Sequence, residues 1–193
     1  MTQPTILIVP GLRDHVPQHW QTLLAARLDK VRTVAPMGRQ DLDCGARCAA
    51  IEQEAQAIEG DIVLVAHSGG VVTVAHWAQS TRRQIKGAVL ATPPDFETPM
   101  PDGYPGIDAL EHAGWLPVPW CKLPFPSIVA ASRNDPLARF DRVAEMADDW
   151  GSALVDLGDV GHLNPASGFG EWPGALDLID RVAGGPLSAR KTA

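Results

Sequence analysis

A serine that follows an apolar strand and is flanked by very small residues is the strongest chemical signal in this chain. Residues 61–72 read DIVLVAHSGGVV, so the strand runs directly into Ser68 and the chain continues as an apolar helix. In a nucleophile elbow the serine occupies a sharp strand-to-helix turn, and the residues two before and two after it are small. Here they are Ala66 and Gly70, so the first position departs from the usual glycine by one methyl group. The stretch predicts a nucleophilic serine.

Two other interpretations fit glycines between a strand and a helix. Ser68 is also a suitable N-cap for a helix in any α/β protein, and this alternative stays open on the local sequence alone. Phosphate binding would need a Gly-Lys-Ser/Thr or Gly-x-Gly-x-x-Gly pattern, and neither opens an early helix of the chain. Phosphate binding therefore does not fit.

An activated serine needs a base that takes its proton and an acid that holds the base in the right tautomer. Both must lie on loops at the carboxyl ends of strands, where ligands bind in a doubly wound sheet. Asp135 follows a predicted strand and precedes a proline, which restricts its backbone to extended conformations. His162 follows a glycine on the loop after the last predicted strand. The order Ser68, Asp135, His162 is the order in α/β-hydrolases.

Other residues compete for these roles. Asp159 is a second candidate for the acid, but it lies only three residues before His162, so we prefer Asp135. His15 and His19 have the spacing of helical metal ligands, yet no adjacent glutamate completes a zinc-protease pattern and a proline separates them. We expect His67 to point away from Ser68, and His76 to lie two turns further down the helix. His112 is expected in the segment after the fourth strand.

The oxyanion of a tetrahedral intermediate needs two backbone N–H groups that point to one place. The residue after the nucleophile supplies one of them in this type of site, and here it is Gly69. The second should come from the loop after the first strand, where Gly11 allows the backbone to turn beneath the site. We expect Leu12 to be that donor.

Short apolar strands alternate with helical patterns along the whole chain, which indicates a parallel sheet covered on both faces. The expected fold class is α/β, a doubly wound, mostly parallel sheet in a single domain over residues 1–193. Strands are predicted at 5–9, 31–35, before Ser68, 85–91, 127–131 and 153–157. Helices are predicted after Pro17 and at 42–58, 71–78, 140–150 and 175–183.

The segment from about 92 to 126 differs from the rest. It holds nine of the 17 prolines and little periodicity, and a connection of this length is usually functional. We expect it to form a reduced cap over the strand ends, with Trp115 and Trp120 as substrate-binding residues of a shallow apolar pocket.

Composition excludes several classes of function. The net charge of −7 leaves no basic stripe for nucleic acid, and no apolar run is long enough for a membrane span. The first residues lack the pattern of a secretory signal, and three cysteines, an odd number, favour a reducing compartment. We therefore expect a cytoplasmic protein. Cys44 and Cys48 lack further ligands at metal spacing, so they are interpreted as buried apolar residues.

Five stretches of the chain together resemble one family: IVPGL at 8–12, HW at 19–20, AHSGG at 66–70, SRNDP at 132–136 and GHLN at 161–164. They are similar to those of the small serine hydrolases of the retinoblastoma-binding-protein-nine and YdeN-like type. The resemblance covers nearly the whole chain in order. It implies an α/β-hydrolase fold with a reduced cap, and a triad of Ser68, Asp135 and His162. It does not settle the substrate.

The expected function is an esterase-like hydrolase for a small-molecule acyl substrate, with no metal and no organic cofactor. An interaction protein built on a hydrolase fold is an alternative, because fold alone does not decide function. An acyltransferase with the same acyl-enzyme is a third. Nothing in the sequence indicates a protein partner.

Overall fold

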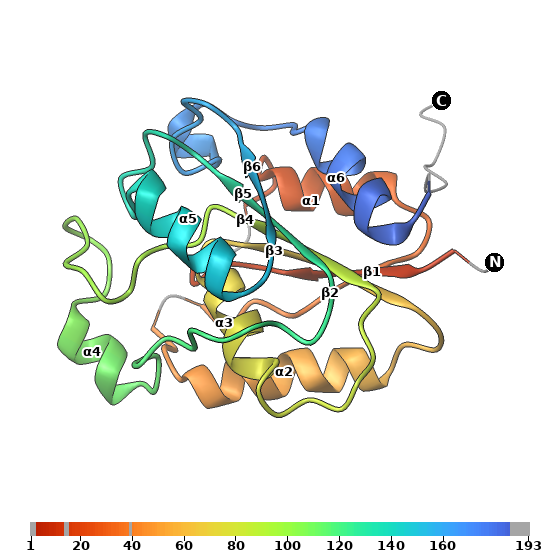
Figure 1. Cartoon of the computed structure of the whole chain (residues 1–193), viewed down its shortest axis with the longest axis horizontal. Coiled ribbons are helices and arrows are strands. Elements are labelled where there is room, and N and C mark those ends of the chain that lie inside the picture. Colours follow the sequence, from red (N-terminus) through yellow and green to blue (C-terminus); the bar gives the residue numbers. More distant parts are fainter. Residues whose placement is uncertain (1–2, 14–15, 39, 186–193) are drawn as a thin grey trace.

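Six parallel strands form one sheet at the centre of the molecule (Figure 1), in the order β2-β1-β3-β4-β5-β6. A computed structural model of the chain describes residues 3–13, 16–38 and 40–185. The strands are β1 (Thr5–Val9), β2 (Val31–Thr33), β3 (Ile62–His67), β4 (Gly87–Ala91), β5 (Ser127–Ala131) and β6 (Ala153–Asp156). The helices are α1 (Trp20–Arg27), α2 (Cys44–Gln56), α3 (Gly69–Trp77), α4 (Ile107–His112), α5 (Phe140–Asp149), a short 3-10 turn (Pro165–Ser167) and α6 (Gly174–Ala183).

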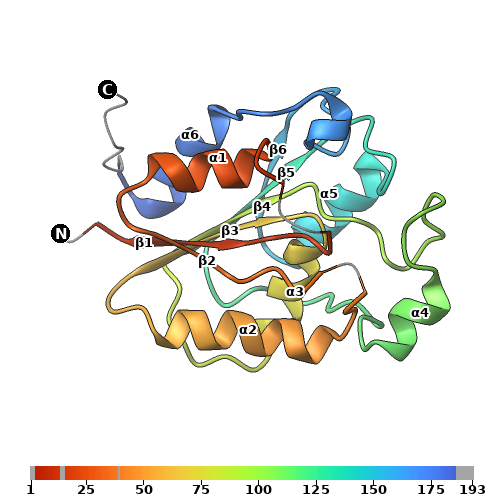
Figure 2. The ribbon, with the colours of Figure 1, turned by 180° about the vertical axis from the view of Figure 1, so that it is seen from behind.

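Helices cover both faces of the sheet, as the alternation of elements predicts. Figure 2 shows α1 and α6 on one face and α2 and α3 on the other. The core residues divide in the same way: those of α1 and α6 belong to one apolar cluster, and those of α2, α3 and α5 belong to the other. Successive side chains of β3 alternate between the clusters, with Leu64 in one and Val65 in the other. A strand buried on both faces needs such a continuous apolar sequence.

The strand order places a crevice where the site was expected. The chain passes from β1 to β2 in one direction and then returns to β3 on the other side of β1. At such a reversal the loops after the two neighbouring strands diverge and leave a crevice at their carboxyl ends. The loop after β1 carries Gly11 and Leu12, and the turn after β3 carries Ser68. The topology therefore brings the predicted oxyanion loop to the predicted nucleophile.

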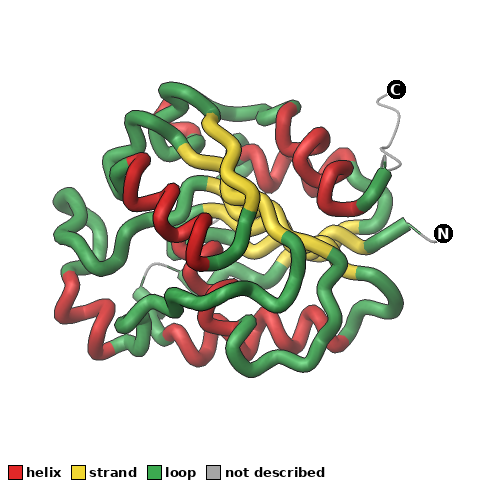
Figure 3. The backbone as a smooth tube through the Cα atoms, in the orientation of Figure 1, coloured by secondary structure: helices red, strands yellow, loops and turns green. Residues whose placement is uncertain are grey.

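The connection from β4 to β5 contains more structure than its sequence suggested. The backbone in Figure 3 forms helix α4 within it, at the side of the molecule where the strands end. Its first part lies close to the loop before α5, because the Asp95 amide donates to the Leu137 carbonyl at 2.9 Å. Its last part packs into the core instead, with Val118, Leu123 and Phe125 buried in the cluster of α3 and α5. Only part of the expected cap therefore lies over the strand ends.

Among the described residues, no helix is both long and apolar enough to cross a membrane.

Candidate active site

Ser68 occupies a strained turn between β3 and α3. Its φ of 55° and ψ of −135° lie in a region that residues with a side chain rarely adopt, which is the geometry of a nucleophile elbow. The surrounding structure maintains this conformation: the Ser68 amide donates to the Ala91 carbonyl at 3.0 Å, and its carbonyl accepts from the Val71 amide at 2.8 Å. The Ser68 hydroxyl makes no capping hydrogen bond to α3. The N-cap alternative therefore does not explain this serine.

The small residues around Ser68 are required by close contacts. A Cβ atom on Gly70 would lie 2.7 Å from the Val9 carbonyl oxygen, so only glycine allows α3 to approach the end of β1. A Cβ atom on Gly11 would lie 3.1 Å from the Ser68 Cβ, which shows how closely the loop after β1 passes the nucleophile. Ala66 is fully buried in β3, so its methyl group is accommodated.

The three predicted triad side chains form one chain of hydrogen bonds. The His162 Nε2 atom lies 2.8 Å from the Ser68 Oγ, and the His162 Nδ1 atom lies 2.8 Å and 3.1 Å from the two carboxylate oxygens of Asp135. The imidazole is 5% exposed and the carboxylate 2% exposed, so water competes little for these bonds. With the proton on Nδ1, the imidazole donates to Asp135 and accepts from the serine hydroxyl. This arrangement can remove the serine proton when the oxygen attacks an electrophile.

The acid is held in place by its own loop. One carboxylate oxygen of Asp135 accepts from the Leu137 amide at 2.9 Å, a local turn that fixes the side chain after its extended backbone. The competing Asp159 is exposed, and within the described part of the chain no hydrogen bond joins it to the His162 ring. The structure thus brings Asp135 to His162, and Asp159 lies outside this chain of bonds.

Several neighbours that were not predicted hold the loop of His162. The Asn134 side-chain oxygen accepts from the Gly161 amide at 2.6 Å, and the Ser167 hydroxyl accepts from the His162 amide at 3.0 Å. Gly161 has a φ of 56°, and a Cβ atom there would lie 2.6 Å from the Ser167 hydroxyl. Asn134 lies in the SRNDP stretch beside Asp135, but only the folded structure shows that its side chain reaches the loop of His162.

His67 belongs to the support of the site. Its Nε2 atom donates to the His162 carbonyl at 2.9 Å, and its ring centre lies 5.0 Å from that of the His162 ring. Burial, with the nearby His162 and His19 rings, lowers the pKa of His67 well below its usual range. The imidazole is therefore neutral at pH 7 and acts as a fixed donor beneath the base.

The other histidines have structural contacts. The His19 Nδ1 atom accepts from the Gln21 amide at 3.2 Å and caps α1, whereas His76 bonds to the Trp115 carbonyl at 3.0 Å. His112 is exposed and contacts the Asp108 carbonyl. His15 lies outside the described residues, so its spacing to His19 stays an expectation. The part of the chain that the structure describes holds no group of three or more side chains suited to a metal ion.

Both predicted oxyanion donors lie beside the nucleophile. Gly69 begins α3, and the Leu12 side chain packs so closely on it that a Cβ atom there would lie 2.6 Å from the Leu12 Cγ. Among the hydrogen bonds between described residues, none uses the amide of Leu12 or Gly69. Two unused amides next to a serine hydroxyl can receive developing negative charge on an oxygen atom.

A cleft of about 620 Å³ opens over these groups. Its lining includes Ser68, His162 and the loop after β1, and on the opposite side residues from the connection between β4 and β5, namely Pro94, Phe96, Met100, Gly103, Tyr104 and Pro105. A volume of this size fits a small-molecule site.

The prediction that Trp115 and Trp120 line this cleft is wrong. Trp115 is fully buried; its indole N–H donates to the Leu42 carbonyl at 2.6 Å, and its ring packs edge-on against Phe96. The Trp120 indole N–H donates to the Glu97 carboxylate at 3.2 Å. Both rings lie behind the cleft wall, where each N–H finds an acceptor. Composition predicted that the tryptophans are buried, but it did not show which apolar residues of the segment line the cleft; they include Phe96 and Met100.

A parallel sheet, a strained serine after its third strand and a histidine and an aspartate on loops after its last two strands define the α/β-hydrolase class. The chain belongs to the serine hydrolase family, which its sequence matches over residues 6–181.

Solved structures agree with this membership. A protein from Pectobacterium atrosepticum described as a YdeN-like hydrolase is 28% identical, with a TM-score of 0.78 over 94% of this chain and 90% of that one. The ydeN gene product of Bacillus subtilis is 17% identical, with a TM-score of 0.71 over 93% and 98%. Est1E from Butyrivibrio proteoclasticus, solved with bound ferulic acid, is 17% identical, with a TM-score of 0.60 over 83% and 82%. No curated protein matches the sequence. The resemblance to YdeN-like hydrolases and the fold class are therefore confirmed.

Proposed function

We propose that this hydrolase is a carboxylesterase-like enzyme that acts on small acyl substrates through an acyl-enzyme on Ser68. The observation that carries the proposal is the continuous line of hydrogen bonds from the Ser68 hydroxyl through the His162 imidazole to the Asp135 carboxylate. A base within 2.8 Å of a hydroxyl, itself oriented by a buried acid, is the arrangement that activates a serine.

The proposed reaction has two halves. Ser68 Oγ attacks the ester carbonyl carbon while His162 Nε2 takes the serine proton, and the amides of Leu12 and Gly69 bind the carbonyl oxygen as it becomes negative. The C–O bond to the alcohol then breaks, and the alcohol leaves with the proton from His162. In the second half, water loses a proton to His162, attacks the acyl-enzyme and releases the acid, and Ser68 recovers its proton. Asp135 keeps the imidazole oriented throughout.

The groups named above account for every bond and proton in this scheme, so we propose neither a metal nor an organic cofactor. The cleft volume supports small acyl substrates. Cys44, Cys48 and Cys121 are all free thiols, which goes with our proposal of a cytoplasmic location, where thiols stay reduced.

A fluorophosphonate probe tests the nucleophile directly. We expect one adduct per chain by intact-mass spectrometry, located at Ser68 by peptide mapping, because only an activated serine reacts. Ser68→Ala should prevent labelling, leave the circular dichroism spectrum unchanged and lower kcat for p-nitrophenyl acetate by about 10⁶-fold. A matched control is Ser80→Ala, which removes a hydroxyl group near the end of α3 that does not line the cleft.

The same experiment separates the alternatives. Labelling at another serine, or unchanged turnover in Ser68→Ala, would contradict the assignment. Labelling at Ser68 without turnover of any ester would favour the interaction protein. An acyltransferase would label in the same way but would pass the acyl group to an added alcohol faster than to water.

A further inference from the structure

One charged side chain in the cleft has no role in the proposed reaction. Of the described residues that line the cleft, Arg13 is the only lysine, arginine, aspartate or glutamate. It follows Leu12 directly, so it extends the loop that supplies the proposed oxyanion donor. The chain as a whole carries a net charge of −7, so composition alone would not predict that the charged side chain in this cleft is a cation.

The contacts of Arg13 with other described residues use few of its donors. Its Nη2 atom donates to the Gly103 carbonyl at 3.2 Å, and its guanidinium lies 4.1 Å above the centre of the Tyr104 ring. Both partners also line the cleft. A guanidinium has five N–H donors, and stacking on a ring fixes its plane without using them.

Among the arginines of the described residues that form no ion pair, Arg13 is the one that lines the cleft. No ion pair among the described residues includes Arg13, although its side chain is exposed at the cleft. Five other arginines each contact a carboxylate, namely Arg27, Arg32, Arg133, Arg139 and Arg142. In a protein with more acidic than basic residues, an arginine held by a ring and one carbonyl is positioned to receive an anion from outside.

The position of Arg13 suits a substrate that extends along the cleft. A Cβ atom on Gly11 would lie 3.1 Å from the Ser68 Cβ, and the Arg13 backbone follows within about 7 Å of Gly11, before its own side chain is counted. Ser68 and Arg13 both line the cleft, so a molecule whose carbonyl lies at Ser68 and whose chain runs along the cleft can bring a second polar group to the Arg13 guanidinium.

We infer that Arg13 binds a carboxylate on the substrate, so that the preferred esters are those that carry a free carboxylate a few carbons from the ester carbonyl, such as monoesters of dicarboxylic acids. The inference rests on the proposed function, because it assigns the substrate class of the same site. An anionic carboxylate would make a planar, two-pronged contact with the guanidinium, and an amide of the same shape would not.

Matched esters test this assignment. Monoethyl adipate carries a carboxylate, and its amide analogue, ethyl 6-amino-6-oxohexanoate, has the same shape without the charge. A second pair, 6-acetoxyhexanoate and its amide, places the carboxylate on the alcohol side. We expect kcat/KM of the wild-type protein to be roughly tenfold higher for the carboxylate in at least one pair, with the ratio falling as NaCl is raised.

Three variants locate the effect. Arg13→Gln should bring the carboxylate-to-amide ratio close to one, whereas Arg13→Lys should retain part of it because the charge remains. Arg32→Gln is the matched control, since Arg32 pairs with Glu54 on β2 and α2 and does not line the cleft; its ratio should equal that of the wild type.

Three results would overturn the inference. The first is a wild-type carboxylate-to-amide ratio near one in both pairs. If the enzyme still hydrolysed the amide-bearing esters, the proposed function would stand and only the role of Arg13 would fail. Arg13→Gln that slowed both members of a pair equally would show that Arg13 only ties the loop to Gly103. If no ester were hydrolysed and the fluorophosphonate did not label Ser68, both proposals would fail.

Discussion

The two walls of the cleft are held by different means. On the wall of Ser68 and His162, the functional groups are largely buried, and positive φ values at Ser68 and Leu163 place the backbone in strained conformations. Short hydrogen bonds from several loops hold that strain in place. The opposite wall, from residues 94 to 105, has Phe96 buried at its base and the exposed Gly103 near its rim.

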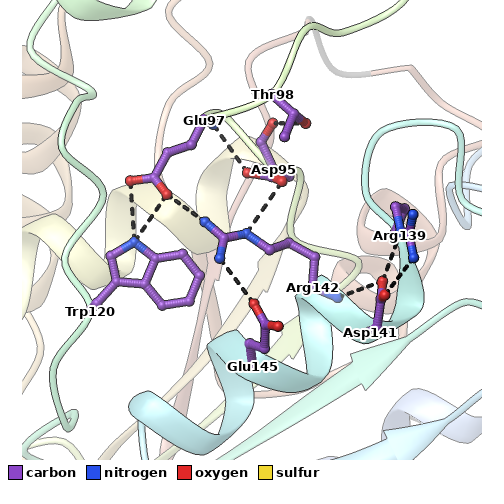
Figure 4. A network of polar contacts seen from close by, with 8 residues as sticks. All are labelled: Asp95, Glu97, Thr98, Trp120, Arg139, Asp141, Arg142 and Glu145. Atoms are coloured by element: carbon purple, nitrogen blue, oxygen red, sulfur yellow. Dashed lines mark hydrogen bonds and ion pairs between the residues drawn. The ribbon is translucent and has the colours of Figure 1, made fainter.

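A polar cluster holds the base of this second wall (Figure 4). The Arg142 guanidinium on α5 contacts the carboxylates of Asp95, Glu97 and Glu145 at 3.3, 2.5 and 3.0 Å. It also lies 4.0 Å above the centre of the Trp120 ring. Asp95 and Glu97 flank Phe96, so the contacts of Arg142 on α5 hold one of the residues that line the cleft. At the rim, Arg13 contacts the Gly103 carbonyl and the Tyr104 ring.

We expect this difference to separate the residues that determine the reaction rate from those that determine which substrates are preferred. The first wall should tolerate little change without loss of rate, because its groups act as one unit. The second should tolerate change at the cost of stability or of discrimination between substrates. The following variants test that division, from the largest expected effect to the smallest.

Asp135→Asn should lower kcat by about 10⁴-fold with the fold intact, because the amide permits the wrong imidazole tautomer. Initial rates on p-nitrophenyl acetate, with circular dichroism as the check on folding, measure this. Asp159→Asn is the matched control: the same chemical change at an exposed residue on the His162 loop should leave the rate nearly unchanged. The reverse ranking would move the acid to Asp159, and equal small losses would speak against a triad.

Sequence was sufficient for the first wall because local patterns and chain order determine it. Small residues around Ser68 reflect contacts between adjacent elements, and parallel strands must end at the same edge of a sheet. The meeting of the Asp135 and His162 loops at Ser68 could therefore be predicted without any knowledge of long-range packing. The predicted helices and strands agree with the structure to within a few residues, including the first helix, which begins at Trp20, three residues after Pro17. The one α-helix of the described residues that was not predicted is α4.

Sequence was insufficient for the second wall because partners distant in the chain determine it. Trp115 lies behind the wall because Leu42 supplies an acceptor for its indole, and Trp120 because Glu97 and Arg142 surround it. Helix α4 was missed because six residues are too few for a periodic pattern among prolines. The donor role of His67 was missed because its acceptor, the His162 carbonyl, is 95 residues away in the chain.

Arg142→Met tests the second wall. Its removal leaves the Asp95 carboxylate, 4% exposed, without its cation, so we expect a loss of about 2 kcal/mol in the free energy of unfolding, or roughly 4–8 °C in Tm. The ratio of kcat/KM between p-nitrophenyl butyrate and acetate should change several-fold as Phe96 loses its support, with kcat on acetate less affected.

Arg139→Met is the control, at the residue that directly precedes the same helix. Arg139 also forms a close ion pair, with Asp141 at 2.6 Å, but both side chains are exposed. An exposed pair contributes little, so neither Tm nor the substrate ratio should change measurably. If the two variants behaved alike, the cluster around Arg142 would not be what fixes the wall.

The smallest expected effect concerns pH and the burial of the first wall. The pKa of His67 is lowered in the folded protein, chiefly by burial, whereas in the unfolded chain it is about 6.5. Below that pH the unfolded chain takes up a proton that the folded imidazole does not, so the folded state loses stability as the pH falls. Between pH 7 and pH 5.5 this residue should lower the free energy of unfolding by about 1 kcal/mol.

Urea denaturation at the two pH values measures this effect. His67→Gln, which keeps a donor for the His162 carbonyl, should reduce the pH dependence by that amount. His112→Gln, at an exposed histidine, should leave it unchanged. If His67→Gln kept the pH dependence of the wild type, water would reach the His67 imidazole, and the wall of Ser68 and His162 would be less buried than we have argued.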